Sequence, residues 1–268
     1  MVNVILAGPC GRMGVRIATL LLEEHDIKLT AAFEKADHPA VGEDLGDKLA
    51  LLPYRQITIS GDLNKVIDQG DVIIDFTHHT ASLENLRIAA AAGKPMVIGT
   101  TGFTEAEKAE AAQLATRTKV VLAPNMSVGV NLMFKLVADM AAILDDSYDA
   151  EIVEIHHRLK KDAPSGTAMK LAEILAEARQ VRLADNAVYH RQGMTGERPV
   201  GKIGIQTLRA GDVTGEHTVI FGTTGERLEI THKAHNRDNF AKGAIRAAKW
   251  IVNQPHGLYD MMDVLNLR

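Results

Sequence analysis

Apolar runs typical of buried strands alternate with helical patterns in the first half of the chain. Residues 2–7 form a short apolar run, and Ile17, Leu20 and Leu21 then recur with the spacing of one helix face. Further on, Thr104 and Glu107 form a capping box that predicts a helix through Leu114. The predicted strands are residues 2–7, 28–33, 71–76, 95–98 and 119–122, with another helix at 81–91. This order predicts an α/β fold with a Rossmann-like, doubly wound parallel sheet.

The pattern changes near residue 203. Three β-rich runs, at residues 203–208, 216–221 and 228–232, are separated by turns that contain glycine, which is typical of an antiparallel sheet. We therefore expect a second, α+β part of the chain whose sheet is open and mostly antiparallel.

Two further segments complete the predicted organisation. Between residues 37 and 61 the pattern is irregular and includes Gly42, Gly46 and Pro53, so we predict a surface excursion rather than core. The last helix presents one apolar face, with Asp238 or Asn239 as its N-cap. That face consists of Phe240, Ala244, Ala247, Ala248 and Ile251.

A glycine-rich turn separates the first strand from the first helix. It is Gly8-Pro9-Cys10-Gly11-Arg12-Met13-Gly14, with a G-x-x-G-x-x-G spacing. Glycines let the backbone turn tightly and approach a pyrophosphate, whose charge suits the helix N-terminus. Glu34 follows the second strand and is placed to bind ribose hydroxyls, whereas the adjacent Lys35 could meet a 2′-phosphate. The pair leaves the choice between NADH and NADPH open.

The segment from Glu154 to Ala168 combines titratable residues with an anion-binding turn. A strand period of two places Glu154 and His156 on one face and His157 on the other, and Lys160 follows closely. A histidine that titrates near neutrality can act as a general acid. The alternative without a catalytic role is a solvent-exposed strand end followed by a basic loop.

The turn in this segment precedes a predicted helix. Ser165 can cap that helix, and the N–H groups at Gly166 and Thr167 would then favour a carboxylate or phosphate. An anionic ligand is therefore expected at this turn.

These motifs together resemble the 4-hydroxy-tetrahydrodipicolinate reductase family, also called dihydrodipicolinate reductases, over nearly the whole chain. The matching motifs are Gly11-Arg12-Met13-Gly14, Asp75-Phe76-Thr77, Gly99-Thr100-Thr101-Gly102-Phe103, Asn125 to Asn131 and the Glu154–Ala168 segment. The resemblance implies NAD(P)H-dependent reduction of 4-hydroxy-tetrahydrodipicolinate, through dihydrodipicolinate, to tetrahydrodipicolinate in the diaminopimelate route to lysine.

The resemblance also implies roles for individual residues. His156 would be the acid/base residue and Lys160 a proton donor, while His157, Gly166 and Thr167 would bind the carboxylates of a small cyclic dicarboxylate. His78 stands where some members have arginine, which argues against a strong preference for NADPH, and both NADH and NADPH are expected to bind. The implied cofactor contacts are Gly8, Pro9, Cys10, Gly11, Arg12, Met13, Glu34, Lys35, Gly99, Thr100, Thr101, Ala123, Pro124, Asn125 and Met126.

The same resemblance implies a division of the chain. Residues 1–126 and 239–268 would form the dinucleotide-binding domain, and residues 127–238 an inserted domain for substrate binding and tetramerisation. A homotetramer is therefore expected.

Composition narrows the classes of partner and the compartment. The net charge of −4 and 4% aromatic content do not favour nucleic acid or an anionic membrane. Cys10 is the only cysteine, which suits a reducing cytoplasm. No leader pattern and no apolar run of about 20 residues is present, so we expect an unprocessed cytoplasmic protein. The eleven histidines show no metal-ligand spacing, and no metal is predicted.

Two other functions are weighed against this one. A different imino- or oxo-acid reductase would share the glycine turn and Glu34, but would have no reason to keep the complete segment 154–168. A redox-sensing regulator that only binds NAD(P) would need neither an acid/base histidine nor Lys160.

Overall fold

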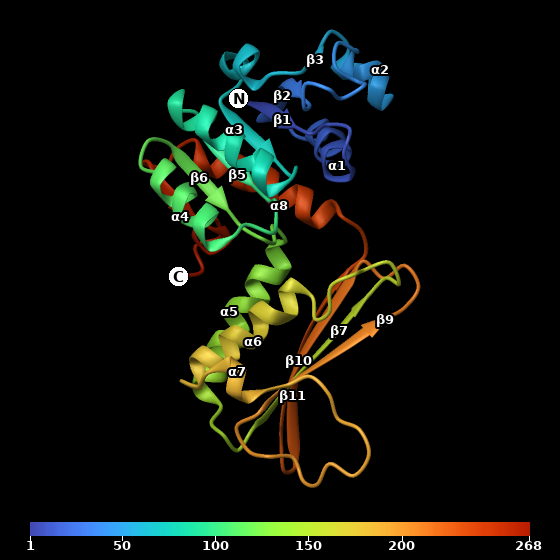
Figure 1. Ribbon diagram of the computed structural model, residues 1–268, viewed down its shortest axis with the longest axis vertical. Coiled ribbons are helices and arrows are strands. Elements are labelled where there is room, and N and C mark those ends of the chain that lie inside the picture. Colours follow the sequence, from blue (N-terminus) through green and yellow to red (C-terminus); the bar gives the residue numbers. More distant parts are fainter. The chain divides into compact units, whose positions relative to one another are not determined.

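The computed structural model describes residues 1–268 and forms two compact units. The first contains Met1–Val128 together with Arg237–Arg268, and the second contains Gly129–Asn236. Figure 1 shows both units, with the C-terminal segment in red lying among the blue and green elements of the first. The second unit is therefore an insertion between two segments that fold together.

The first unit is built on a seven-stranded parallel sheet in the order β12-β6-β5-β4-β1-β2-β3. Its strands are β1 (Val2–Ala7), β2 (Ile27–Phe33), β3 (Ile59–Ser60), β4 (Val72–Asp75), β5 (Met96–Ile98), β6 (Lys119–Leu122) and β12 (Gly257–Tyr259). Its α-helices are α1 (Arg12–Leu21), α2 (Leu45–Leu49), α3 (His79–Ala91), α4 (Glu105–Leu114), α8 (Asp238–Ile251) and α9 (Met261–Val264). Short 3₁₀ turns lie at η1 (Leu52–Tyr54), η2 (Leu63–Lys65) and η3 (Ile67–Gln69). The predicted Rossmann-like fold is confirmed.

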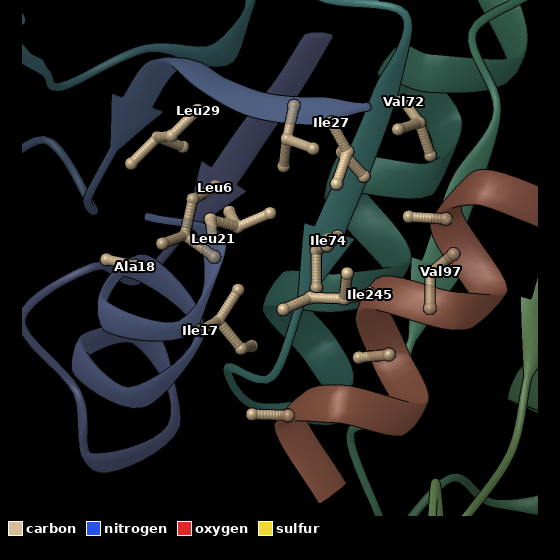
Figure 2. Packing of buried hydrophobic residues seen from close by; sticks show 14 of the residues in the cluster. Leu6, Ile17, Ala18, Leu21, Ile27, Leu29, Val72, Ile74, Val97 and Ile245 are labelled. Carbon is tan, nitrogen blue, oxygen red and sulfur yellow. The ribbon is translucent and has the colours of Figure 1, made fainter. Parts of the chain in front are cut away.

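Both faces of this sheet are buried, because successive residues of each strand point to opposite sides. On β1, Leu6 packs in one core with residues of α1 and α8, whereas Ile5 packs in the other core with α3 and α4. Figure 2 shows the first of these cores, where Ile17 and Leu21 of α1 and Ile245 of α8 converge on the strand residues. The continuous apolar strands seen in the sequence follow from this two-sided burial.

The predicted surface excursion at residues 37–61 is wrong in part. Leu45, Tyr54 and Ile59 are almost completely buried and belong to the core shared with α1. The Tyr54 hydroxyl donates a hydrogen bond to the carbonyl of Ala18 at 2.7 Å, and β3 pairs with β2. Short elements with few periodic positions gave no pattern from which this burial could be read.

The helix caps of the first unit give one confirmed prediction and one correction. Thr104 and Glu107 form the expected reciprocal capping box at the start of α4. On α8, however, Arg237 occupies the N-cap position without a side-chain hydrogen bond, and Asp238 is the first helical residue. The Asp238 carboxylate is instead paired with Arg16 of α1, at 2.7 Å, so a tertiary contact replaces the local cap.

The second unit is a five-stranded sheet in the order β11-β10-β7-β9-β8. The strands are β7 (Asp149–His156), β8 (Ala187–Val188), β9 (Ile203–Arg209), β10 (Gly215–Thr223) and β11 (Glu226–Ala234). Two long helices, α5 (Val128–Ile143) and α6 (Gly166–Ala178), pack on one face, and α7 (Leu183–Asn186) precedes β8. The long β10–β11 hairpin is antiparallel, as predicted, and β10 is also antiparallel to β7.

The first of the three C-terminal β-rich runs departs from the prediction. β9 pairs with β7 in parallel, and β8 pairs with β9 in parallel. A helix, α6, lies between β7 and β8 in the chain, and such a crossover brings the following strands back in the same direction. The sheet is therefore mixed, with its longest ladder antiparallel.

Candidate active site

A cavity of about 600 Å³ opens at the carboxyl ends of β1 and β2 in the first unit. Five of the predicted cofactor residues line it: Gly8, Cys10, Gly11, Glu34 and Lys35. Sequence reasoning missed other lining residues, which come from the segments that follow β2 and β3 and from α3 after β4. These include His38, Asp62, Leu63 and Asn85, and His78 also lines the cavity. Ligands of doubly wound sheets bind at this edge, where strand order reverses around β1.

The glycine turn adopts the close backbone approach expected from its sequence. Gly8 has a left-handed φ of 64°, and a Cβ on Gly14 would lie 2.1 Å from the Gly8 carbonyl oxygen. Glu34 accepts a hydrogen bond from the backbone N–H of Cys10 at 3.0 Å, which holds its carboxylate beside the turn. Burial and the neighbouring Glu34 raise the pKa of the Cys10 thiol, which disfavours the reactive thiolate.

The remaining predicted cofactor residues lie outside the lining of that cavity. Arg12 and Met13 begin α1, and Pro9 lies in the turn before it. Gly99 allows the Phe76 ring to approach, because a Cβ there would lie 2.2 Å from the ring. Thr100 is buried and shares a hydrogen bond with Ser82 at 2.8 Å. Thr101 is exposed. In the segment after β6, Ala123 and Met126 are buried in the core, so only their backbone could reach a cofactor. Pro124 and Asn125 lie between them.

The absence of a metal site stays a prediction. Possible ligand atoms of Cys10, Glu34 and His38 lie within 4.8 Å of one another in the first unit. All three residues line the cavity at the ends of β1 and β2, and Glu34 already accepts a hydrogen bond from the backbone N–H of Cys10.

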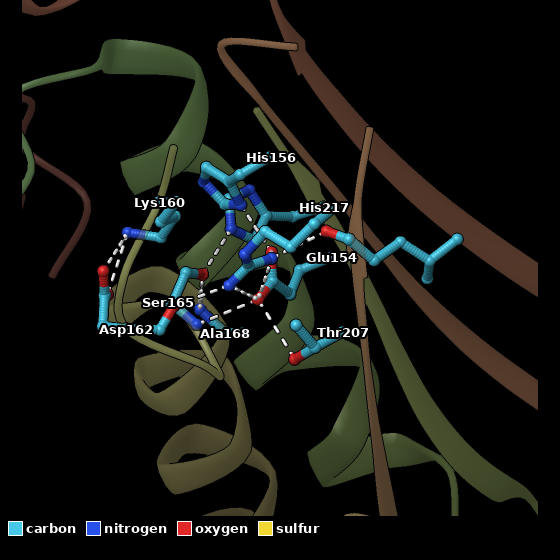
Figure 3. A network of polar contacts seen from close by, with 10 residues as sticks. Glu154, His156, Lys160, Asp162, Ser165, Ala168, Thr207 and His217 are labelled. Atoms are coloured by element: carbon cyan, nitrogen blue, oxygen red, sulfur yellow. Dashed lines mark hydrogen bonds and ion pairs between the residues drawn. The ribbon is translucent and has the colours of Figure 1, made fainter. Parts of the chain in front are cut away.

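A buried polar network occupies the end of β7 in the second unit, as Figure 3 shows. Glu154 is fully buried, and His156 is 8% exposed. Alternate residues of β7 face the same side, and the carboxylate of Glu154 meets Nδ1 of His156 at 2.5 Å. The sequence prediction that these two side chains share a face is confirmed.

Three residues from two other segments converge on the Glu154 carboxylate. Arg209, at the end of β9, donates to both oxygens at 3.0–3.1 Å. Thr207 donates its hydroxyl at 3.1 Å, and the backbone N–H of Ser165 donates at 3.1 Å. Burial raises the pKa of Glu154, but the bonds from His156 and Arg209 outweigh burial and lower the pKa to about 2. The carboxylate is therefore charged at neutral pH.

His217 lies opposite Glu154 in the β7–β10 ladder and is 4% exposed. Its ring is 5.1 Å from that of His156, and Nε2 shares a 2.9 Å hydrogen bond with the Ser165 hydroxyl. Burial, followed by the proximity of His156, lowers the pKa of His217 to about 3. This second histidine is consequently neutral and structural at physiological pH.

The neutral state of His217 predicts an acid-sensitive stability. Because its pKa falls from 6.5 to about 3 on folding, only the unfolded chain takes up this proton as pH drops through that interval. The contribution of His217 to the free energy of unfolding is thus fully present above pH 6.5 and is lost progressively toward pH 3, by at most about 1.4 kcal/mol per pH unit. Urea unfolding of wild type and His217→Gln should show a difference in unfolding free energy that narrows over this range. A constant difference would contradict the assignment.

The N-terminus of α6 lies next to this network. Ser165 is its N-cap and accepts a hydrogen bond from the N–H of Ala168 at 3.1 Å, as the sequence predicted. A Cβ added to Gly166 would meet no atom within 4 Å, so open space lies above the first turn. A helix start with such space and a positive dipole end suits a carboxylate.

Lys160 and His157, which the sequence predicts to contact the substrate, lie in the loop between β7 and α6. The Lys160 ammonium pairs with Asp162 at 2.8 Å, and its side chain is 20% exposed. Nδ1 of His157 is buried without a hydrogen-bond partner. Thr167 follows Gly166 in the first turn of α6. The structure thus gathers His156, Lys160 and the turn around one short loop.

Sequence reasoning missed His217, Thr207 and Arg209. They lie on β9 and β10, and their approach to Glu154 depends on strand register that no local pattern specifies. One available signal was the alternation of β10, which places His217 on the same strand face as the buried Val219 and Phe221.

The two units together define a nicotinamide-nucleotide-dependent oxidoreductase. One unit has a glycine turn, an acidic residue after β2 and a cavity at the strand ends, and the other has a buried histidine–carboxylate pair beside a helix N-terminus. No helix in the structure combines the length and apolar character that a membrane span needs.

Comparison with known proteins specifies the family. The sequence profiles for the N-terminal and C-terminal parts of dihydrodipicolinate reductase match residues 2–126 and 129–265. The 4-hydroxy-tetrahydrodipicolinate reductases of Syntrophus aciditrophicus and Desulfotalea psychrophila are 56% and 53% identical over 268 residues, covering all of this chain and 100% and 99% of theirs. The chain belongs to the dihydrodipicolinate reductase family.

Solved structures agree with this membership. A dipicolinate-bound dihydrodipicolinate reductase from Paenisporosarcina sp. TG-14 superposes with a TM-score of 0.77, at 27% identity and with 98% of each chain covered. An amine dehydrogenase from Mycobacterium smegmatis, 15% identical over 96% of this chain and 94% of its own, has a TM-score of 0.61 and shares the fold alone.

Proposed function

We propose that this protein reduces 4-hydroxy-tetrahydrodipicolinate, through dihydrodipicolinate, to tetrahydrodipicolinate with NADH or NADPH, in lysine synthesis by the diaminopimelate route. The observation that carries the proposal is the buried pair of Glu154 and His156 beside the N-terminus of α6. Full-length relatives that are named for this activity support it. A regulator that only senses NAD(P) would need no such pair.

A bound reduced nicotinamide would supply a hydride to the conjugated carbon of the cyclic imine after water has been lost. The resulting enamine then needs a proton on carbon, and His156 donates it from Nε2, assisted by Lys160. The N-terminus of α6 at Gly166 and Thr167, with His157 and Lys160, binds the two carboxylates. A hydride and a proton are thereby added across one double bond of the substrate.

Use of both cofactors follows from two neighbouring side chains. Glu34 is held beside the glycine turn by its bond to Cys10, in position for the ribose hydroxyls of NADH. Lys35 is exposed and paired only with Asp37, at 3.1 Å, an ion pair weak enough to be exchanged for a 2′-phosphate. His78 lines the same cavity and adds no permanent charge.

The proposed assembly is a cytoplasmic homotetramer formed through the second unit. Helices α5 and α6 cover only one face of its sheet. On the other face Ile155 is partly exposed, and its cross-strand neighbour Leu208 is 44% exposed. Sedimentation of the purified protein tests this arrangement.

Turnover tests the proposed function. Purified protein is mixed with pyruvate, aspartate semialdehyde and the preceding synthase, and loss of absorbance from NADH and NADPH is followed in separate reactions. Consumption that needs both substrate and protein, with either cofactor, is the expected result. Binding of both nucleotides without any turnover would favour a regulator or another imino acid.

A change at Gly166 should separate substrate binding from stability. Gly166→Ala adds a methyl group in open space at the first helical position, so it should leave stability unchanged or raise it by about 0.5–1 kcal/mol. The same methyl group would stand where the substrate carboxylate meets the helix start. Kinetics should show KM for the substrate raised at least about tenfold, which is about 1.4 kcal/mol of binding. An unchanged KM would remove Gly166 from the site.

A further inference from the structure

Glu154 is a buried charged group to which the proposed reaction assigns no proton of its own. Its Oε2 lies 2.5 Å from Nδ1 of His156, and the residue is fully buried. An ionised carboxylate can only accept hydrogen bonds, so Nδ1 must carry a hydrogen. The other ring nitrogen, Nε2, is then the one that can exchange a proton with a ligand.

The surroundings of Nε2 are consistent with that role. Gly215, at the start of β10, is the neighbour of this nitrogen, and a Cβ built there would lie 3.0 Å from Nε2. Any larger residue would press on the ring. The strand therefore carries no side chain at the position that faces the reactive nitrogen.

The same carboxylate also holds the turn that precedes α6. Its Oε1 accepts from the backbone N–H of Ser165, the N-cap of that helix. Arg209, which binds both oxygens, donates in addition to the carbonyl of Asp162 at 2.6 Å. The imidazole and the helix start are thus bound to opposite oxygens of one side chain.

Stability alone is a poor reason for such an arrangement. A buried ion pair is often no more stable than well-packed apolar residues of similar volume, because both charges must leave water. A buried carboxylate that accepts from five donor groups, contributed by three segments of the chain, instead determines geometry.

We propose that Glu154 is a positioning residue, which holds His156 in the Nδ1–H tautomer and fixes its ring relative to the N-terminus of α6. The proton donated to the substrate leaves from Nε2 of the imidazolium, beside the bound carboxylates, and the ring that remains is the Nδ1–H tautomer that Glu154 holds. The proposal rests on the proposed role of His156 in turnover.

Two matched glutamates on β7 provide the test. Glu154→Gln keeps the shape but lets the amide present its NH₂ group to Nδ1, which favours the wrong tautomer. The expected result is a fall in kcat of about 10²–10⁴-fold, with the Kd for NADH unchanged. Glu151→Gln is the control: Glu151 is on the same strand and is also paired with arginines, Arg191 and Arg198, but does not contact His156. Its kcat should stay within about threefold of wild type.

A spectroscopic measurement separates positioning from a merely structural role. In protein labelled with ¹⁵N-histidine, the Nδ1–H of His156 should give a downfield proton signal that is protected from exchange. The signal should be absent in His156→Asn and in Glu154→Gln, but present in Glu151→Gln. Should Glu154→Gln fail to fold, the wild-type spectrum decides, because an unprotonated Nδ1 in His156 would overturn the proposal.

The outcomes also distinguish this proposal from the one on which it depends. Near-normal kcat in Glu154→Gln, together with an inactive His156→Ala, would overturn the positioning role and leave the proposed reaction intact. Normal kcat in His156→Ala would contradict the role of His156 itself, whatever the spectrum shows.

Discussion

A His156→Ala protein is expected to bind NADH as tightly as wild type but to turn over its substrate about 10²–10⁴-fold more slowly. The reason is that in the proposed reaction the imidazole supplies the proton that completes the reduction, while the glycine turn and Glu34, which are proposed to hold the nucleotide, belong to a different unit of the chain. Steady-state kcat and the Kd from NADH fluorescence titration measure the two effects separately.

The matched control is another histidine of the second unit. His190 is exposed and shares a hydrogen bond only with Gln192, at 3.2 Å. His190→Ala should therefore retain wild-type kcat within about twofold, because surface substitutions away from a site rarely exceed ±0.5 kcal/mol. A His156→Ala protein with undiminished kcat, or one that has lost NADH binding to the same extent as turnover, would refute the assignment.

Gly14→Ala should disable the nucleotide turn. The new Cβ would lie 2.1 Å from the Gly8 carbonyl oxygen and 2.7 Å from the Pro9 Cα, and both are backbone atoms that cannot move without reshaping the turn. Overpacking of this kind lowers the free energy of unfolding by about 1–3 kcal/mol. We expect the Kd for NADH to rise at least about tenfold, which corresponds to about 1.4 kcal/mol.

Gly222→Ala on β10 is the control for a general intolerance of larger residues. A Cβ at Gly222 would have only the Cβ of Arg227 nearby, at 4.0 Å. That variant should keep both NADH affinity and stability. Unchanged NADH binding in Gly14→Ala would show that the turn does not carry the cofactor.

Local patterns were sufficient for much of the fold. The parallel sheet follows from apolar strands buried on both faces, and the capping box of Thr104 and Glu107 lies where the sequence places it. Tertiary contacts decided the exceptions. The Tyr54 hydroxyl donates a hydrogen bond to the carbonyl of Ala18 in α1, which holds the ring in the core. Asp238 forms an ion pair with Arg16 instead of capping α8.

The site was predictable to the extent that it lies on contiguous residues. The strand period brings Glu154 to His156, and Ser165 caps α6 as its local sequence indicates. Arg209 and His217 were not predictable, since the parallel pairing of β9 with β7 and the register of β10 bring them in from elsewhere in the chain. The same is true of Asp62, in the loop after β3, and Asn85, on α3, which line the cavity at the ends of β1 and β2.

Transfer of a labelled hydride tests the central claim most directly. NADH that carries deuterium at the transferring C4 position is supplied to wild-type protein with substrate generated in place by the synthase, and the tetrahydrodipicolinate formed is analysed by mass spectrometry. The account predicts product that contains one deuterium, formed only when this protein is present, and almost none with His156→Ala in the same time. Oxidation of the labelled NADH without deuterium in the product, or no product at all, would contradict it.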